Sequence, residues 1–356
     1  MKPNKQTQKY LLAPLFTNKK NSPAMNKQQQ EEEEEEEQNS WLEEIYDQLV
    51  ALKNKTATKI VIEGSSVRLQ QTKLLVCHYV EGIKTEIQDW SVMPPRIVDG
   101  PKMHKPRFHT EMVTLPNGNV AAFGGVDYLF FSTFPKGEIF TPARSKFFSV
   151  GKMCEPRERP AGVLLRTNVV FLCGGERNTS LMHLQSCEFY DPSTRKFTPS
   201  KATLNTGRAG HTATLLPDGT VLVAGGITED YTHLCSTEIY NPLTDSFSVG
   251  PQMLFRHSGH AAVALEDGRV FVCGNSSRKT ELYDHATRSF QRGPDVPTKR
   301  TRVAAFLLPD GRVVIMGSKG QHYAENKLTE IFDPMTNRIT AGPDITNTYK
   351  LNAALF

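Results

Sequence analysis

Short apolar runs alternate with turn residues along most of the chain after residue 58. In HTATLLPDGTVLVAGG (His211–Gly226), two strand-sized runs flank a turn at Pro217-Asp218-Gly219, and a glycine pair follows the second run. Apolar runs of this length bounded by Pro, Asp and Gly predict two β-strands joined as a hairpin. The same pattern recurs at Met112–Gly125, Gly162–Gly175, Ala262–Asn275 and Ala305–Ser318.

The pattern belongs to a longer repeat with further markers. The first glycine-like positions, 124, 174, 225, 274 and 317, are spaced by 50, 51, 49 and 43 residues. Each copy thus holds four short strands, and a period near 50 with four strands is typical of a propeller blade. The later markers are a glutamate (Glu138, Glu188, Glu238, Glu281, Glu330, and Glu86 ahead of the first copy), an aromatic residue (Phe140, Tyr190, Tyr240, Tyr283, Phe332) and a late hydrophobe (Phe148, Phe197, Phe247, Phe290, Ile339).

These markers recur in register, and residues 58–356 resemble the kelch-repeat family. The resemblance implies an all-β fold, a kelch-type β-propeller, and the six glutamate markers predict that it is six-bladed. KLNAALF at the C-terminus aligns with TRVAAFL of the preceding copy, so we expect the C-terminal strand to close the ring as the inner strand of blade 1. Residues 58–70 would then form a hairpin beside blade 1, or supply its inner strand instead.

The first 57 residues differ from the propeller in composition. Residues 1–39 are polar and of low complexity, with seven consecutive glutamates at Glu31–Glu37. Such a segment cannot bury enough apolar surface to offset chain entropy, so we predict a disordered tail. Residues 40–57 are predicted to hold a short amphipathic helix, Trp41–Lys53, and a linker.

The helix has a capping signal and an apolar face. Ser40 and Glu43 form a capping box, and Leu42, Ile45 and Leu49 recur at helical spacing. The helix would pack on the following domain or contact a partner. The stretch LEEIYDQL…TKIVIEGSSVRLQQTKLLVCHYV also resembles the opening of a BTB domain, a domain that precedes kelch repeats in ubiquitin-ligase adaptors. A full BTB fold needs roughly a hundred residues, so we interpret this stretch as a remnant and assign no ligase binding to it.

Charge and cysteine content narrow the functional class. The formal net charge is +4, and residues 58–356 carry 34 basic and 28 acidic residues, a net charge of +6. This mild excess, without clustered aromatic residues, argues against nucleic-acid binding. No run is apolar enough to span a membrane, and no signal-peptide core is present. Six cysteines without a CxxC pair, among them the buried-strand residues Cys77, Cys173 and Cys273, suggest a reducing, cytoplasmic location and no metal site.

A basic residue precedes the inner strand of five copies. Five basic residues around one channel mouth would bind carboxylate or phosphate, and adaptors of the kelch family bind acidic peptides in this manner. The alternative is that each basic residue pairs with the repeat glutamate and only holds the blades together. The aligned residues are Arg107, Arg157, Arg208, His257 and Arg300.

Aromatic side chains occupy the loops after the glycine pairs. These residues would contact a partner, or fold back onto the neighbouring blade. The candidates are Tyr128, Phe131, Tyr231, His322 and Tyr323.

The function predicted from these features is a non-catalytic protein-interaction module that binds a partner protein or acidic peptide. It would be a monomer without cofactors, acting as an adaptor in ubiquitin ligation or as a scaffold. The alternative is a sugar-binding or enzymatic propeller of the galactose-oxidase or sialic-acid-epimerase type. We favour the first because His211 and His260 align as repeat positions, where packing explains a histidine better than metal binding does.

Overall fold

The computed structural model describes residues 73–78, 85–105, 107–127, 132–177, 182–274, 278–319, 328–345 and 351–355. The chain divides into two compact units, Met1–Arg68 and Leu69–Phe356, and all described residues belong to the second. The predicted tail and helix, residues 58–70 and most of the BTB-like stretch therefore lie outside the described part. That part contains no helix, and so none with the length and apolarity of a membrane span.

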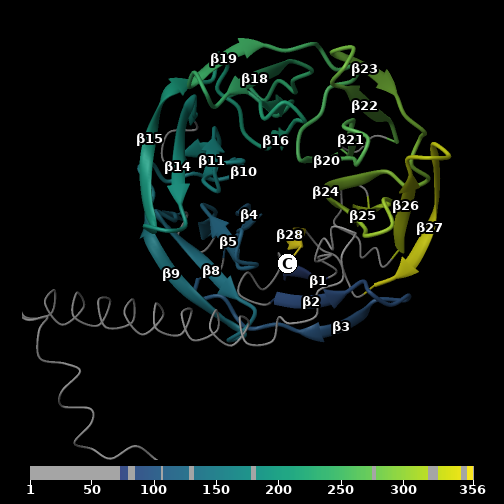
Figure 1. The fold of residues 1–356 in the computed structure, drawn as a ribbon, viewed down its shortest axis with the longest axis horizontal. Coiled ribbons are helices and arrows are strands. Elements are labelled where there is room, and N and C mark those ends of the chain that lie inside the picture. Colours follow the sequence, from purple (N-terminus) through teal and green to yellow (C-terminus); the bar gives the residue numbers. More distant parts are fainter. Residues whose placement is uncertain are drawn as a thin grey trace, which may run out of the picture. The chain divides into compact units, whose positions relative to one another are not determined.

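Five four-stranded antiparallel sheets are each formed by one continuous stretch of sequence, and we name each blade after its inner strand. The sheets are arranged in a ring with the inner strands at its centre (Figure 1), which confirms the predicted all-β propeller. From inner to outer strand, the blades are β4 (Glu111–Thr114), β5 (Val120–Phe123), β8 (Lys136–Thr141), β9 (Lys146–Lys152); β10 (Ala161–Leu164), β11 (Val170–Cys173), β14 (Ser186–Asp191), β15 (Lys196–Thr203); β16 (Thr212–Leu215), β17 (Val221–Ala224), β18 (Thr237–Asn241), β19 (Ser246–Val249); β20 (His260–Ala264), β21 (Val270–Gly274), β22 (Thr280–Asp284), β23 (Ser289–Arg292); and β24 (Arg300–Leu307), β25 (Val313–Lys319), β26 (Leu328–Asp333), β27 (Arg338–Asp344).

A further four-stranded sheet, the composite sheet, is assembled from both ends of the described chain. Its order is β28 (Leu351–Leu355), β1 (Lys73–His78), β2 (Thr85–Asp89) and β3 (Arg96–Asp99). The C-terminal strand β28 pairs antiparallel with β1 and contacts the inner strands β4 and β24 on either side. The predicted six blades thus correspond to five continuous blades and this composite sheet, and the C-terminal strand takes the inner position that its sequence indicated.

The turn between the first two strands of a blade follows from its Asp-Gly pair. In the β16 blade, Gly219 has a φ of +87°, a left-handed conformation that glycine adopts without steric cost. The Asp218 carboxylate accepts hydrogen bonds from the backbone N and Oγ1 of Thr220, at 2.9 and 2.6 Å. Leu216 N donates to Thr220 O at 2.8 Å, which closes the hairpin. The predicted hairpin is confirmed here.

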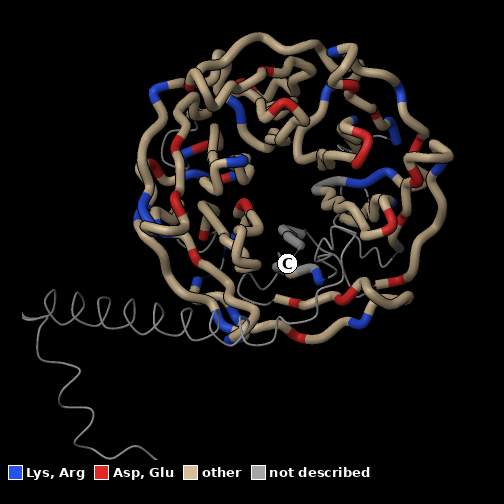
Figure 2. The backbone as a smooth tube through the Cα atoms, viewed as in Figure 1, with Lys and Arg blue, Asp and Glu red and all other residues tan. Residues whose placement is uncertain are grey.

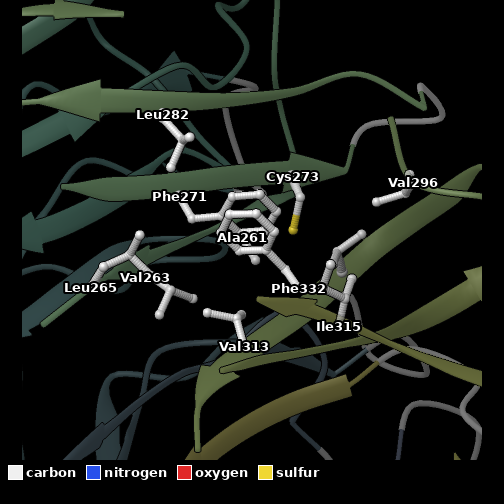
Figure 3. Close-up of a cluster of buried hydrophobic side chains, with 11 residues drawn as sticks. Ala261, Val263, Leu265, Phe271, Cys273, Leu282, Val296, Val313, Ile315 and Phe332 are labelled. Carbon is white, nitrogen blue, oxygen red and sulfur yellow. The ribbon is translucent and has the colours of Figure 1, made fainter. Parts of the chain in front are cut away.

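The hydrophobic core lies between neighbouring blades. Figure 3 shows one of its clusters, in which side chains from the β20 blade meet those from the β24 blade. Phe271 stacks on the marker aromatic Phe332 with ring centroids 4.1 Å apart, and Phe171 stacks on Tyr240 at the same distance. The marker aromatics therefore join each blade to the next. Two smaller ribbons, β6 (Val126–Asp127) with β7 (Ser132–Thr133) and β12 (Glu176–Arg177) with β13 (Met182–His183), lie in the loops after the glycine pairs.

Candidate functional site

The five basic residues that precede the inner strands are buried, with at most 3% of each exposed. Every one of them contacts the repeat glutamate of its own blade: the four arginines form ion pairs, and His257 lies within hydrogen-bonding distance of its glutamate. Because these side chains are enclosed and paired, the expectation that their guanidinium groups face a partner is wrong, and the alternative of pairing within the blade is the one observed. The pairs are Arg107 Nε–Glu138 Oε1 (2.9 Å), Arg157 Nε–Glu188 Oε1 (2.6 Å), Arg208 Nη2–Glu238 Oε1 (2.8 Å), His257 Nε2–Glu281 Oε1 (3.0 Å) and Arg300 Nε–Glu330 Oε2 (2.8 Å).

The buried pairs also explain the glycine pair of the repeat. Arg157 Nη1 donates to the carbonyl of Gly174 at 2.8 Å, and the Glu188 carboxylate accepts from Cys154 N at 2.7 Å. Gly174 has a φ of +60°, and a Cβ there would lie 2.6 Å from the carbonyl oxygen of Arg208 in the next blade. Only glycine fits this close approach. Basic residue, glutamate and glycine are thus one structural unit that fixes the loops.

A chain of backbone hydrogen bonds links successive blades where the inner strands begin. Arg159 N donates to His109 O at 3.0 Å, Gly210 N to Arg159 O at 3.1 Å, and Gly259 N to Gly210 O at 2.7 Å. All four residues have positive φ, between 51° and 61°. Glycine occupies two of these positions, but His109 and Arg159 hold the same conformation with large side chains. Unfavourable backbone conformations in non-glycine residues occur often at functional sites.

The two non-glycine residues belong to a polar group that we call the mouth cluster: His109, Glu158, Arg159, Glu176 and His183. His109 Nδ1 lies 2.5 Å from Glu158 Oε1, and Glu158 is 5% exposed. Arg159 Nη2 lies 2.9 Å from Glu176 Oε1, whose other oxygen is 3.1 Å from His183 Nε2. This cluster brings two carboxylates, two imidazoles and a guanidinium together between the β4 and β10 blades.

Glu111 lies two residues beyond His109, in β4. Its carboxylate accepts a hydrogen bond from Gly162 N in the next blade, and burial raises the pKa of Glu111 to about 8. A Cβ at Gly162 would lie 2.9 Å from Cγ of Glu111, so the carboxyl needs the space that this glycine leaves. A carboxyl with this pKa is mostly protonated at neutral pH.

Among the loop aromatics, Tyr231 lies in the described part and is 63% exposed, whereas Tyr128, Phe131, His322 and Tyr323 lie outside it. Close to Tyr231 along the loop, the exposed His233 places Nδ1 2.7 Å from Ser258 Oγ and accepts a hydrogen bond from Arg256 Nη1 at its carbonyl. Leu254, in the same loop as Arg256, is 53% exposed. We call Tyr231, His233, Leu254 and Arg256 the loop patch.

Sequence reasoning missed the mouth cluster and most of the loop patch. The sequence does contain a signal for the mouth cluster, because one repeat differs from two others just before its inner strand. Glu158-Arg159 stands there where the β16 and β20 blades have Ala209-Gly210 and Ser258-Gly259. Among the described residues, no group of three or more His, Cys, Asp or Glu side chains could bind a metal ion.

Comparison with known proteins agrees with this architecture. The family model of the Kelch motif matches residues 208–254, a span that contains Arg208, the hairpin of the β16 blade and Glu238. The described part of the protein is a β-propeller, and its repeat at residues 208–254 matches the kelch motif. None of the curated proteins matches the chain.

Two solved structures show the same fold. The structure of YjhT aligns with a TM-score of 0.66 and 10% identity over 80% of this chain and 100% of that one. A fungal alcohol oxidase of the AA5 family, in complex with copper, aligns with a TM-score of 0.58 and 16% identity over 79% of this chain. The alignment spans 64% of the oxidase. At these identities the likeness concerns the fold.

Proposed function

We propose that this protein is an interaction module that binds a partner protein through the loop patch. The observation that carries the proposal is a contrast within the loops that surround the inner strands: the buried basic residue–glutamate pairs form their lower layer, and the exposed side chains of the loop patch belong to their upper layer. The lower layer repeats from blade to blade, and its charges are buried and paired. The upper layer differs between blades and presents Tyr231 and Leu254 to solvent.

The chemistry of the loop patch suits protein recognition. Tyr and Arg are enriched among the residues that dominate binding energy at interfaces, because each combines a large contact area with hydrogen-bonding groups. Arg256 is held by its bond to the His233 carbonyl, and the loop carrying Tyr231 is closed by Thr228 N donating to Thr232 O at 3.1 Å. A patch fixed in this way loses little conformational entropy on binding.

The proposal retains a protein partner but moves the contact away from the buried basic residues. A module that holds one partner in this way would serve as an adaptor or scaffold, including one for ubiquitin ligation. We also propose that it acts in the cytoplasm. The cysteine pattern supports this, because the six cysteines include no CxxC pair and do not form the spacing of a disulfide framework.

The test compares two double variants with equal changes in charge. Tyr231→Asp with Leu254→Asp alters the loop patch. Leu243→Asp with Met335→Asp alters two turns between third and outer strands, where these side chains are 94% and 93% exposed. A partner identified by capture from lysate and mass spectrometry would then be titrated against each purified variant. We expect a loss of at least about tenfold in affinity for the loop-patch variant only, since hot-spot truncations cost about 2 kcal/mol or more. Equal affinities would refute the proposal.

The mouth cluster favours a second candidate, a site for a small organic ligand of the sugar type. Carboxylates, imidazoles and a guanidinium suit hydroxyl and carboxyl groups, and Glu111 has a pKa suited to proton transfer near neutral pH. The described residues offer no three-ligand site for copper, so the candidate includes no step through that metal. Binding of galactose or sialic acid that is abolished by Glu158→Gln would favour this candidate over the first.

A further inference from the structure

Two cysteines face each other inside the β10 blade. Cys173 at the end of β11 is the direct cross-strand partner of Cys187 in β14, and both side chains are buried in the same hydrophobic cluster. Gly174 N donates to Ser186 O at 3.2 Å, so the cysteines occupy a non-hydrogen-bonded position of the antiparallel pair. At such positions the Cα atoms lie about 4.5 Å apart, within the range of about 4.4–6.8 Å that a disulfide spans. The backbone therefore already has the spacing of a disulfide here.

The two thiols interact with each other and lie near charged and titratable groups. A hydrogen bond with the Cys187 thiol is the largest cause that raises the pKa of Cys173, ahead of burial, while the guanidinium groups of Arg157 and Arg208 act to lower it. His211 Nε2 lies 3.5 Å from Cys173 Sγ, and burial keeps this imidazole neutral by lowering its pKa. Figure 2 shows acidic and basic residues intermixed in this part of the ring, which Figure 1 labels β11 and β14. Cys173 is thus a protonated thiol with a proton acceptor within reach.

Cys187 departs from the residue that most other sheets carry directly before the repeat glutamate. Four of them have a threonine whose Oγ1 donates to a proline carbonyl of the outer strand at 2.5–2.8 Å. A glycine before that proline leaves the necessary space, since its Cβ would lie 2.3–2.4 Å from Oγ1. In the β10 blade Ser200 and Lys201 replace this glycine and proline, so the fold itself does not require a cysteine at position 187. The threonines are Thr85, Thr237, Thr280 and Thr329.

The β20 blade offers a comparison within the same chain. Cys273 matches Cys173 in position and is equally buried, but its cross-strand partner is Thr280. Val303 occupies the place that His211 takes in the β10 blade. Burial raises the pKa of Cys273 to about 12. Among the five continuous blades, the β10 blade is thus the one that places a second cysteine and a histidine around the cysteine of its second strand.

We propose that Cys173 and Cys187 are a modification site, at which hydrogen peroxide converts the two thiols into a disulfide. Because both thiols are buried, the oxidant must be small. In the first step the Cys173 sulfur, its proton transferred to His211, attacks a peroxide oxygen. The O–O bond breaks, a sulfenic acid forms, and the departing hydroxide takes the proton back as water. In the second step the Cys187 sulfur attacks the Cys173 sulfur, the S–O bond breaks, and the hydroxyl leaves with the Cys187 proton as a second water. The thiols are oxidised and the peroxide is reduced.

The disulfide would fasten the base of a loop that belongs to the mouth cluster. It would join β11 to β14, and the loop between these strands carries Glu176 and His183. A cross-link of this kind stabilises the folded state mainly by restricting the unfolded chain. In a reducing compartment such bonds are usually transient and often sense oxidants. The loop patch lies in other loops, so the inference does not depend on the proposed function.

The test treats the purified, reduced full chain with hydrogen peroxide, blocks the remaining thiols with iodoacetamide in denaturant, and maps the peptides by mass spectrometry without reduction. Trypsin cleavage after Arg166, Arg177 and Arg195 places the two cysteines in separate peptides. The disulfide is then detected as a linked pair of peptides that dithiothreitol separates. We expect this pair in the wild type, with oxidation of the internal control Cys273 at least about tenfold slower, since thiol oxidation is selective for its surroundings.

The matched variant is Cys187→Thr, which introduces the residue that four other sheets carry at this position. Its thermal midpoint in the reduced state checks that it folds. Oxidation should raise the midpoint of the wild type by roughly 5 °C, dithiothreitol should reverse the rise, and the midpoint of the variant should not change. The inference would be overturned if the wild type formed no linked pair, or if Cys173 and Cys273 were oxidised at equal rates.

Discussion

Replacement of Arg157 by leucine tests whether the buried pairs hold the blades together. Arg157 is fully buried and bonds to Glu188, to the Gly174 carbonyl and to the Ser186 carbonyl, at 2.6, 2.8 and 2.8 Å. Arg157→Leu leaves the Glu188 carboxylate buried without its cation. Removing one member of a buried ion pair typically costs about 3–5 kcal/mol, a large part of the roughly 5–15 kcal/mol by which a domain is stable.

The assay is urea unfolding, followed by circular dichroism and by the fluorescence of the buried Trp90. The matched control is Arg269→Leu, because Arg269 pairs with Asp267 at 2.6 Å while both side chains remain about a third or more exposed. An exposed pair contributes about 0–1 kcal/mol. We therefore expect a loss of about 3–5 kcal/mol for Arg157→Leu and less than about 1 kcal/mol for Arg269→Leu. Similar small losses in both variants would refute the reasoning.

Two further predictions concern pH and the glycine pair. Burial lowers the pKa of His211 and His260 well below the usual value, so their contribution to stability is full above about pH 6.5 and falls as the unfolded state takes up protons below it. His211→Gln with His260→Gln should flatten the decline in unfolding free energy between about pH 7 and 5, and an unchanged slope would contradict this. Gly124→Ala should destabilise by about 1–2 kcal/mol or more, because φ is +69° and its Cβ would lie 2.3 Å from Arg157 O. The control is Gly118→Ala, at φ +80° with no atom within 4 Å of its Cβ, which measures the cost of the positive φ alone. Equal losses in thermal midpoint in the two variants would show that the contact between the Cβ at position 124 and Arg157 O is unimportant.

The sequence predicts the fold well because each repeat marker reflects a local physical demand. The Asp218-Gly219 pair predicts a hairpin since the turn needs a positive φ, and the structure has it. The regular spacing of Phe332 and its counterparts predicts a shared packing role, which the Phe271–Phe332 stack fulfils. The match of KLNAALF to an inner strand predicts ring closure, and β28 pairs with β1.

The site was harder to predict, because repetition identifies structural residues more readily than functional ones. Arg107 and its counterparts align with one another because every blade needs the same buried pair. The candidate functional residues lie where one repeat departs from the others, as Arg159 does from Gly210. Whether a repeated arginine is paired or free depends on whether its side chain is buried, and the spacing of residues along the sequence does not reveal this.

The measurement that tests the central claim most directly is the affinity of an identified partner for the loop-patch variant, Tyr231→Asp with Leu254→Asp. The account predicts an affinity at least about tenfold weaker than that of the wild type, while the Leu243→Asp, Met335→Asp variant binds as the wild type does. Wild-type affinity in the loop-patch variant, with an unchanged thermal midpoint, would contradict the claim that the partner binds there.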